Sequence, residues 1–169
     1  MRTLVADTPE MPGMEPRSPV RVVLDRALRI SGTSRLVHSA RATPLWVMTS
    51  NLSEAPAAMK LGAAGAQVIR VPTNSVPPRG LDLMGVLHAL AQKGITRLLV
   101  EGGARVASSF VAAGLVDEVW LLRGPDTVGA DGIVALDALP LSAITASPTF
   151  KLRVSETLQN DTLTIYGRA

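Results

Sequence analysis

Residues 94–120, GITRLLVEGGARVASSFVAAGLVDEVW, contain the residue types that a phosphate-binding edge of a sheet requires. A short apolar strand ends at Glu101, and the glycines at 102 and 103 let the backbone turn tightly into a helix expected over residues 104–113. The first N–H groups of a helix have no intrahelical partner and lie at the positive end of its dipole, so they attract anions. The segment therefore predicts a site for a nucleotide phosphate.

The glycine pair also fits a second interpretation, a plain strand-to-helix turn in which Glu101 is a solvated strand-end residue. The segment has neither the Gly-Lys-Ser/Thr of a Walker loop nor the Gly-x-Gly-x-x-Gly spacing of a dinucleotide-binding fingerprint. Spacing alone therefore leaves both the turn and the phosphate site open.

The elements that must position this segment alternate between strands and helices along the chain. The apolar, β-branched run at 20–25 is typical of a strand buried on both faces of a parallel sheet, and residues 45–49 repeat that character. Near the C-terminus, two alternating stretches flank a Gln-Asn-Asp turn, which indicates a hairpin. The predicted strands are 20–25, 45–49, 67–71, 97–101, 118–123, 150–156 and 162–166, and the predicted helices are 53–63, 81–93 and 104–113.

Capping residues and prolines mark the boundaries of these elements. Ser53 is the expected cap of the first helix and Gly65 its stop, while Gly94 ends the second helix. The proline-rich residues 1–18 are expected to form an extended arm or loop, and residues 19–169 a single domain. Helices alternating with strands before a terminal antiparallel pair predict an α/β sandwich with a mixed, mostly parallel sheet.

Composition narrows the classes of protein. Hydrophobic residues make up 47% and charged residues 18% of 169 positions, which is typical of one cytoplasmic domain. No apolar run approaches the roughly 20 residues of a membrane span, and no signal peptide is recognisable. The absence of cysteine excludes disulfides, thiolate catalysis and cysteine-bound zinc. The net charge of +3 is scattered along the chain and aromatic residues make up only 3%, so no nucleic-acid partner is expected.

Neither of the two histidines lies in a pattern that indicates catalysis. His88 lies within a predicted helix and His38 follows a short apolar segment, so a solvated or packing role is expected for both. No histidines or acids have the spacing of metal ligands. The sequence therefore assigns no catalytic side chain and no metal site.

Three segments carry a resemblance to a known family. The stretch VEGGARVASSFVAAGLVDEVW resembles the signature of the reductase domain of the bacterial riboflavin-biosynthesis deaminase-reductase. SPVRVVLDRALRI at 18–30 resembles the family's middle strand, and TLVADTPEM at 3–11 resembles the end of its threonine-alanine-aspartate-proline loop. The resemblance implies a dihydrofolate-reductase-like α/β fold. It also implies NADPH-dependent reduction of the ribosyl group of 5-amino-6-(5-phosphoribosylamino)uracil, a pyrimidine phosphate, to a ribityl group.

The family's binding residues carry over to matching positions of this chain. Glu101 matches the substrate-binding acid, whose carboxylate accepts hydrogen bonds from a pyrimidine edge, and Met11 matches an apolar substrate contact. Arg26 lies where other members touch the cofactor, and a guanidinium suits the extra phosphate of NADPH. The implied cofactor-binding residues are Thr3, Asp7, Arg26, Gly103, Ala104, Arg105, Val106, Ala107, Ser108 and Ser109.

Some of these positions have equally plain alternatives. Arg26 fits a surface arginine as well as a phosphate ligand, and Ser108 and Ser109 fit small packing residues as well as hydroxyl donors. The chain also departs from the family pattern, because it opens at the threonine loop and has Thr8 in place of the second acid. We therefore expect the N-terminal strands, about the first third of the domain, to be missing. The arginine that usually follows the aspartate-proline turn has no counterpart either.

Two function classes follow from these observations. The first is the NADPH-dependent pyrimidine reductase of riboflavin biosynthesis, and a dihydrofolate-like reductase with another substrate is its variant. The second is a non-catalytic or degenerate nucleotide-binding or oligomerisation module of the same fold. Missing strands would leave sheet edges and apolar surface unpaired, so the chain is expected to be part of a larger reductase, a degenerate relative, or a domain that pairs with a second copy as a homodimer.

Overall fold

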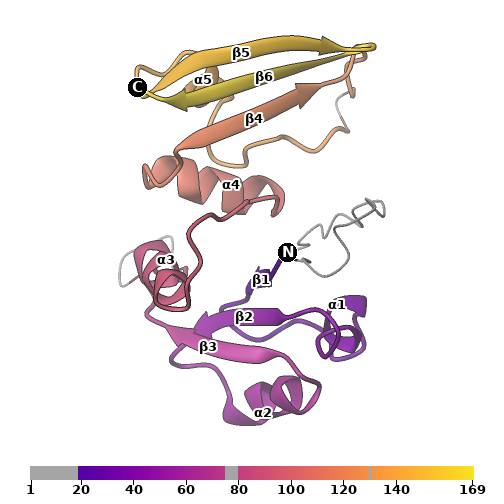
Figure 1. The fold of residues 1–169 in the computed structure, drawn as a ribbon, viewed down its shortest axis with the longest axis vertical. Helices are drawn as coiled ribbons and strands as arrows, with labels where there is room; N and C mark the ends of the chain where they lie inside the picture. The colour runs from indigo at the N-terminus through magenta and orange to yellow at the C-terminus, as the bar shows by residue number, and fades with distance from the viewer. Residues whose placement is uncertain (1–18, 75–79, 130) are drawn as a thin grey trace. The chain divides into compact units, whose positions relative to one another are not determined.

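The computed structural model describes residues 19–74, 80–129 and 131–169, and the chain divides into two compact units between Leu99 and Val100. Unit 1 is the part before this division and unit 2 is the part after it, and Figure 1 labels the helices and strands of both. Each unit has its own three-stranded sheet.

Unit 1 contains a parallel sheet in the order β1-β2-β3. Its strands are β1 (Arg21–Leu24), β2 (Leu45–Ser50) and β3 (Gln67–Val71), which confirms the first three predicted strands. In the register of the sheet Val23 lies beside Val47, and Met48 lies beside Ile69. Val47 and Met48 are fully buried, as the unbroken apolar run of a central parallel strand predicts.

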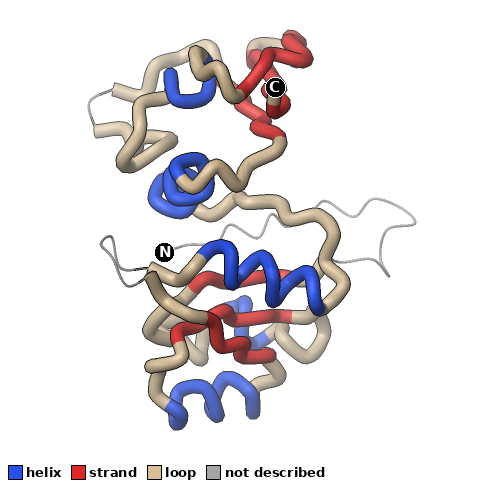
Figure 2. Tube along the Cα trace, turned by 90° about the vertical axis from the view of Figure 1, so that its left-hand side faces the viewer, coloured by secondary structure: helices blue, strands red, loops and turns tan. Residues whose placement is uncertain are grey.

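Helices cover both faces of this sheet, and Figure 2 shows the strands of unit 1 between them. On one face, α1 (Arg35–His38) and α2 (Ala55–Ala63) pack through Val37 and Leu61. On the other face, α3 (Leu83–Gln92) packs through Val86 and Leu90. The sequence did not predict α1, whose single turn is too short to show a periodic pattern.

The expected cap of α2 is wrong. Glu54, not Ser53, precedes the first helical residue, and its side chain makes no cap hydrogen bond. Ser53 Oγ instead accepts a hydrogen bond from the guanidinium of Arg70 at 2.8 Å, which removes it from the helix start. The predicted stops are confirmed, because Gly65 and Gly94 have φ of +101° and +85°, values that favour glycine.

Unit 2 contains α4 (Gly103–Ala112), β4 (Glu118–Arg123), α5 (Ser142–Thr145), β5 (Phe150–Leu158) and β6 (Asp161–Arg168). The strands form an antiparallel sheet in the order β4-β6-β5, which confirms the predicted strand at 118–123 and the C-terminal hairpin. The core of this unit, which includes Ile144, Phe150 and Tyr166, lies on one face of the sheet together with residues of α4 and α5. The sequence did not predict the short α5.

The strand predicted at 97–101 is not present. A strand needs a neighbour to pair its backbone groups, and residues 97–101 have no such partner within the part of the chain that the structure describes. The α/β fold class is confirmed, although the described parallel and antiparallel strands form two sheets rather than the single mixed sheet expected. The arm at 1–18 lies outside the described residues, and the single domain at 19–169 stays a prediction.

Candidate functional site

A hollow of about 480 Å³ lies at the carboxyl edge of the parallel sheet in unit 1. Ligands of open α/β sheets bind outside the carboxyl ends of the strands, where the connecting loops converge. Each of the three strands contributes residues that follow its carboxyl end or lie at it. The lining residues are Arg26 and Ala27 after β1, Ser50, Leu52, Ser53 and Glu54 at the end of β2, and Thr73 and Asn74 after β3.

The loop after β1 is held by a buried carboxylate. Asp25 accepts hydrogen bonds from the backbone N–H of Ile30 at 2.7 Å and of Ala27 at 3.4 Å. The carbonyl of Arg26 accepts from Thr49 Oγ1 at 3.2 Å and from the backbone N–H of Ser50 at 3.3 Å. The backbone of Arg26 is therefore fixed between β1 and β2, while its side chain is exposed.

The hollow contains one side chain of each charge. No carboxylate of the described residues lies within ion-pair distance of the Arg26 guanidinium, so this cation is available to a ligand. Glu54 lines the same hollow at the start of α2, whose first N–H groups receive no side-chain cap. In nucleotide sites an arginine binds a ribose 2′-phosphate, whereas a carboxylate accepts from a ribose 2′-hydroxyl. The hollow therefore offers a cation to a phosphate and an acceptor to a hydroxyl group.

Polar groups around these charges can also meet a phosphate. Ser50 Oγ accepts from the backbone N–H of Leu52 at 2.9 Å, and Ser53 Oγ accepts from Arg70. A hydroxyl that accepts in this way keeps its own hydrogen for donation to another acceptor. The donor set of the hollow thus fits a phosphorylated ribose.

Arg21 lies at the opposite, amino end of β1. Its guanidinium donates to Ser39 Oγ at 2.6 Å and to the carbonyls of Ser39 and Thr43, which ties the start of β1 to the segment before β2. Burial lowers the pKa of Arg21 below its usual value. These bonds hold the amino end of the sheet, opposite the end at which the hollow lies.

The predicted glycine segment begins α4 in unit 2. Gly102 precedes the helix without a side-chain cap, and the N–H of Gly103 donates to the carbonyl of Glu101 at 3.0 Å. Gly103 has φ of +63°, a conformation that favours glycine. The helix predicted at 104–113 is confirmed, and the side chain of Glu101 just before it is exposed.

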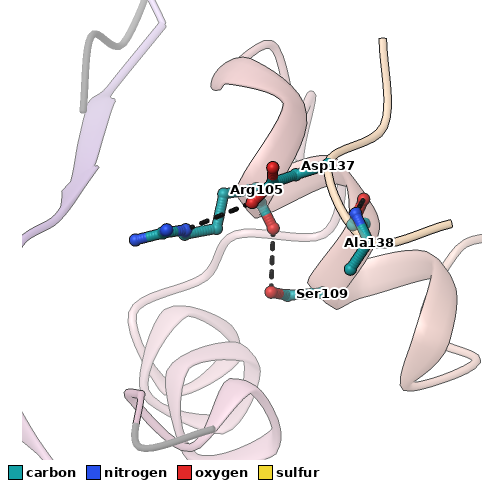
Figure 3. Close-up of polar contacts among 5 residues, drawn as sticks. Arg105, Ser109, Asp137 and Ala138 are labelled. Carbon is teal, nitrogen blue, oxygen red and sulfur yellow. Dashed lines mark hydrogen bonds and ion pairs between the residues drawn. The ribbon is translucent and has the colours of Figure 1, made fainter. Parts of the chain in front are cut away.

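The side chains of this segment make contacts within unit 2 (Figure 3). Arg105 is exposed, and its Nε lies 3.5 Å from Asp137 Oδ2. Ser109 Oγ donates to the carbonyl of Arg105 at 2.8 Å, and the buried Ser108 Oγ accepts from the backbone N–H of Ala138 at 3.4 Å. Ser108 and Ser109 therefore both have protein partners, and the burial of Ser108 favours the packing role over cofactor contact.

The structure brings some of the predicted residues together. Unit 2 contains Glu101, just before α4, and the residues that begin α4: Gly103, Ala104, Arg105, Val106, Ala107, Ser108 and Ser109. Arg26 lies in unit 1. Thr3, Asp7 and Met11 lie outside the described residues.

Neither histidine lies in these sites. His38 ends α1, His88 lies in α3, and the side chains of both are exposed. Where the chain is described, no group of three histidine, aspartate or glutamate side chains could hold a metal ion. Over the same residues, no helix has the length and apolar character that crossing a bilayer requires.

Sequence reasoning missed most of the hollow. Five of its polar lining residues were not predicted as site residues: Ser50, Ser53, Glu54, Thr73 and Asn74. A usable signal was present, because each polar group follows a predicted strand of the parallel sheet or lies at its end.

The sequence matches the RibD C-terminal domain family over residues 1–164. The chain belongs to this family. It is 34% identical over 130 residues to the riboflavin biosynthesis protein RibD of Bacillus amyloliquefaciens, and the aligned region covers 75% of this chain and 33% of that protein. It is 30% identical over 175 residues to the 2,5-diamino-6-ribosylamino-4(3H)-pyrimidinone 5′-phosphate reductase of Methanothermobacter thermautotrophicus. That aligned region covers 98% of this chain and 76% of that protein.

Solved structures show the same fold. RibD of Acinetobacter baumannii matches with a TM-score of 0.68 at 24% identity, over 89% of this chain and 38% of that one. A pyrimidine reductase-like protein of Corynebacterium diphtheriae matches with a TM-score of 0.67 at 19% identity, over 89% of this chain and 61% of that one. The chain spans 33% of the Bacillus RibD and 41% of the RibD of Chlamydia trachomatis.

Proposed function

We propose that the chain is an NADPH-dependent reductase that converts the ribosyl group of 5-amino-6-(5-phosphoribosylamino)uracil to a ribityl group in riboflavin biosynthesis. The observation that carries the proposal is the family match over residues 1–164. The printed names of relatives support it, since they include riboflavin biosynthesis proteins and a pyrimidinone 5′-phosphate reductase.

The residues of unit 1 would hold the phosphorylated ribose of the cofactor. Arg26 would pair with the 2′-phosphate, and Ser50 and Ser53 would donate their hydroxyl hydrogens to it. The bound NADPH supplies the hydride, and the protein supplies binding and orientation.

Unit 2, taken by itself, contains residues that would contact substrate and cofactor. The exposed carboxylate of Glu101 would accept hydrogen bonds from the pyrimidine edge. The segment from Gly103 to Ser109 would bind cofactor phosphate and ribose through the N–H groups of its first turn, because the start of α4 has no side-chain cap. Thr3 and Asp7 would add cofactor contacts, and Met11 an apolar substrate contact. We assign no residue to the proton transfer.

A two-step titration tests this function. NADPH is first titrated against the protein while nicotinamide fluorescence is followed. The pyrimidine phosphate is then added, and the oxidation of NADPH is followed by its absorbance. Saturable binding followed by oxidation supports the reductase. Absence of saturable binding contradicts it, and binding without oxidation favours a non-catalytic nucleotide-binding module.

An apolar face of the sheet in unit 2 favours an oligomerisation role in addition to the proposed reductase activity. Trp120 and Leu122 of β4 are 65% and 60% exposed, and Val154 of β5 shares their face because both Trp120 and Val154 pair with Ile165. We call this the open face. Lys151 lies toward one end of β5 and Glu156 toward the other, so two copies related by a two-fold axis would bring opposite charges together.

We therefore propose a second copy of the chain as the occupant of the open face, so that the protein is a homodimer. Sedimentation of the protein at several concentrations tests this. A dimer that dissociates when Leu122 is replaced by glutamate supports the proposal, and a monomer at all concentrations contradicts it.

A further inference from the structure

Arg70 of β3 lies against the loop that connects β2 to α2. Its Nη1 is 2.8 Å from Ser53 Oγ and 3.0 Å from the carbonyl oxygen of Ser53. The same nitrogen is 3.2 Å from the carbonyl oxygen of Ser50 and 3.3 Å from that of Asn51. One guanidinium nitrogen thus contacts oxygens of three residues of a single loop.

The contacts hold the loop by charge as well as by hydrogen bonds. Nη1 has two hydrogens, so the four oxygens share them, and the positive charge attracts all four dipoles. Among the described residues, the side chain that donates hydrogen bonds to these carbonyls is that of Arg70, through Nη1. Arg70 therefore helps to hold the loop, together with the backbone N–H groups of Leu52 and Ser53, which donate to Ser50 Oγ and to the carbonyl of Ser50.

The loop that Arg70 holds supplies half of the lining of the hollow. Ser50, Leu52, Ser53 and Glu54 are lining residues, whereas Arg70 itself is not. Arg70 consequently acts on a ligand through the loop. Because Ser53 Oγ accepts from Arg70, its hydrogen remains for a ligand oxygen in the hollow.

We propose that Arg70 is a positioning residue that sets the preference of the hollow for a phosphorylated over an unphosphorylated ribose. It places the hydroxyls of Ser50 and Ser53 beside Arg26, so that a phosphate meets donors as well as a cation. The carboxylate of Glu54 repels a phosphate in the hollow. With the loop correctly placed, the hydrogen bonds from the serine hydroxyls are stronger than this repulsion. This inference rests on the proposed function, since it assumes a nicotinamide nucleotide in the hollow.

The test compares NADPH with NADH, which lacks the 2′-phosphate, in titrations of the full chain. Arg70→Gln is expected to weaken NADPH binding about tenfold and NADH binding less than about twofold. Arg70→Lys restores the charge and is expected to recover part of the preference. Arg41→Gln is the matched control, because Arg41 donates to the carbonyl of Ala63 at the other end of α2, and it is expected to change neither affinity.

Ser53→Ala is the companion variant if Arg70→Gln does not fold, because it removes the hydroxyl through which Arg70 would act on the phosphate. It is expected to lower the NADPH preference in the same direction. Two results would overturn this inference alone. One is an unchanged preference for NADPH over NADH in Ser53→Ala and in a folded Arg70 variant. The other is an equal loss of affinity for NADPH and for NADH. Absence of saturable NADPH binding by the unmodified chain would overturn the proposed function and this inference with it.

Discussion

The two sheets of this protein bury their strands to different extents. In unit 1 the central strand β2 is covered by helices on both faces, and Val47 and Met48 have no exposed surface. In unit 2 the core lies on one face of the antiparallel sheet, and Trp120 and Leu122 of β4 are mostly exposed on the other. Parallel sheets need cover on both faces, whereas antiparallel sheets tolerate one open face.

This difference explains where each unit can bind. In unit 1 the connections converge on one edge of the parallel sheet, so polar residues from three loops meet around the hollow that contains Arg26. In unit 2 the sheet offers a flat apolar surface, which suits association with another protein surface rather than with a nucleotide. We therefore propose nucleotide selectivity for unit 1 and assembly for the open face of unit 2.

The largest expected effect comes from opening the core of unit 1. Met48→Ala leaves a cavity at a fully buried position and is expected to lower the free energy of unfolding by about 2–5 kcal/mol. Leu122→Ala on the open face is expected to cost less than about 1 kcal/mol at concentrations where the protein is monomeric. Urea denaturation measures both, and equal losses would contradict the difference in burial.

The next effect concerns the cation of the hollow. Arg26→Ser removes the charge that would pair with a 2′-phosphate and is expected to weaken NADPH binding about tenfold or more. NADH binding is expected to change much less. The matched control is Arg29→Ser, which changes another exposed arginine on the same loop that does not line the hollow. Similar losses in both variants would point to a general effect of charge.

A smaller effect is expected on the open face. Leu122→Glu adds a charge to the apolar surface and is expected to raise the dimer dissociation constant severalfold, about one order of magnitude at most. NADPH affinity is expected to stay unchanged, because neither the hollow nor α4 lies on the open face. Sedimentation and nucleotide titration on one sample check both expectations, and a change in NADPH affinity alone would contradict the division of roles.

The smallest effect is assigned to Glu54. Glu54→Gln removes the negative charge beside Arg26 and is expected to tighten NADPH binding about threefold, because exposed charges interact weakly in water. NADH binding is expected to weaken slightly, since an amide replaces the carboxylate acceptor. Parallel titrations measure both, and tighter NADH binding would show that Glu54 does not contact the ribose.

Much of the fold was predictable because its signals are local. The apolar runs of β1, β2 and β3 and the glycines at 65 and 94 set strand type and helix ends without reference to distant residues. The strand expected at 97–101 failed because pairing depends on a neighbour rather than on the segment's own residues.

The site was less predictable than the fold. The start of α4 was recognised from its glycines, but the hollow is assembled from three loops that are far apart in sequence. Ser53 illustrates the reason, since its pattern fits a helix cap and only the position of Arg70 on the next strand assigns its hydroxyl elsewhere. Long-range contacts of this kind leave no periodic signal.

The central claim is that the 2′-phosphate of NADPH binds at the carboxyl edge of the unit 1 sheet. Its most direct test is a titration of the isotope-labelled protein with NADPH, followed by the NMR shifts of the backbone amides. The account predicts saturable shifts concentrated at residues 26–30 and 50–55, which are much reduced when NADH replaces NADPH. Saturable binding that leaves both groups unshifted would contradict it.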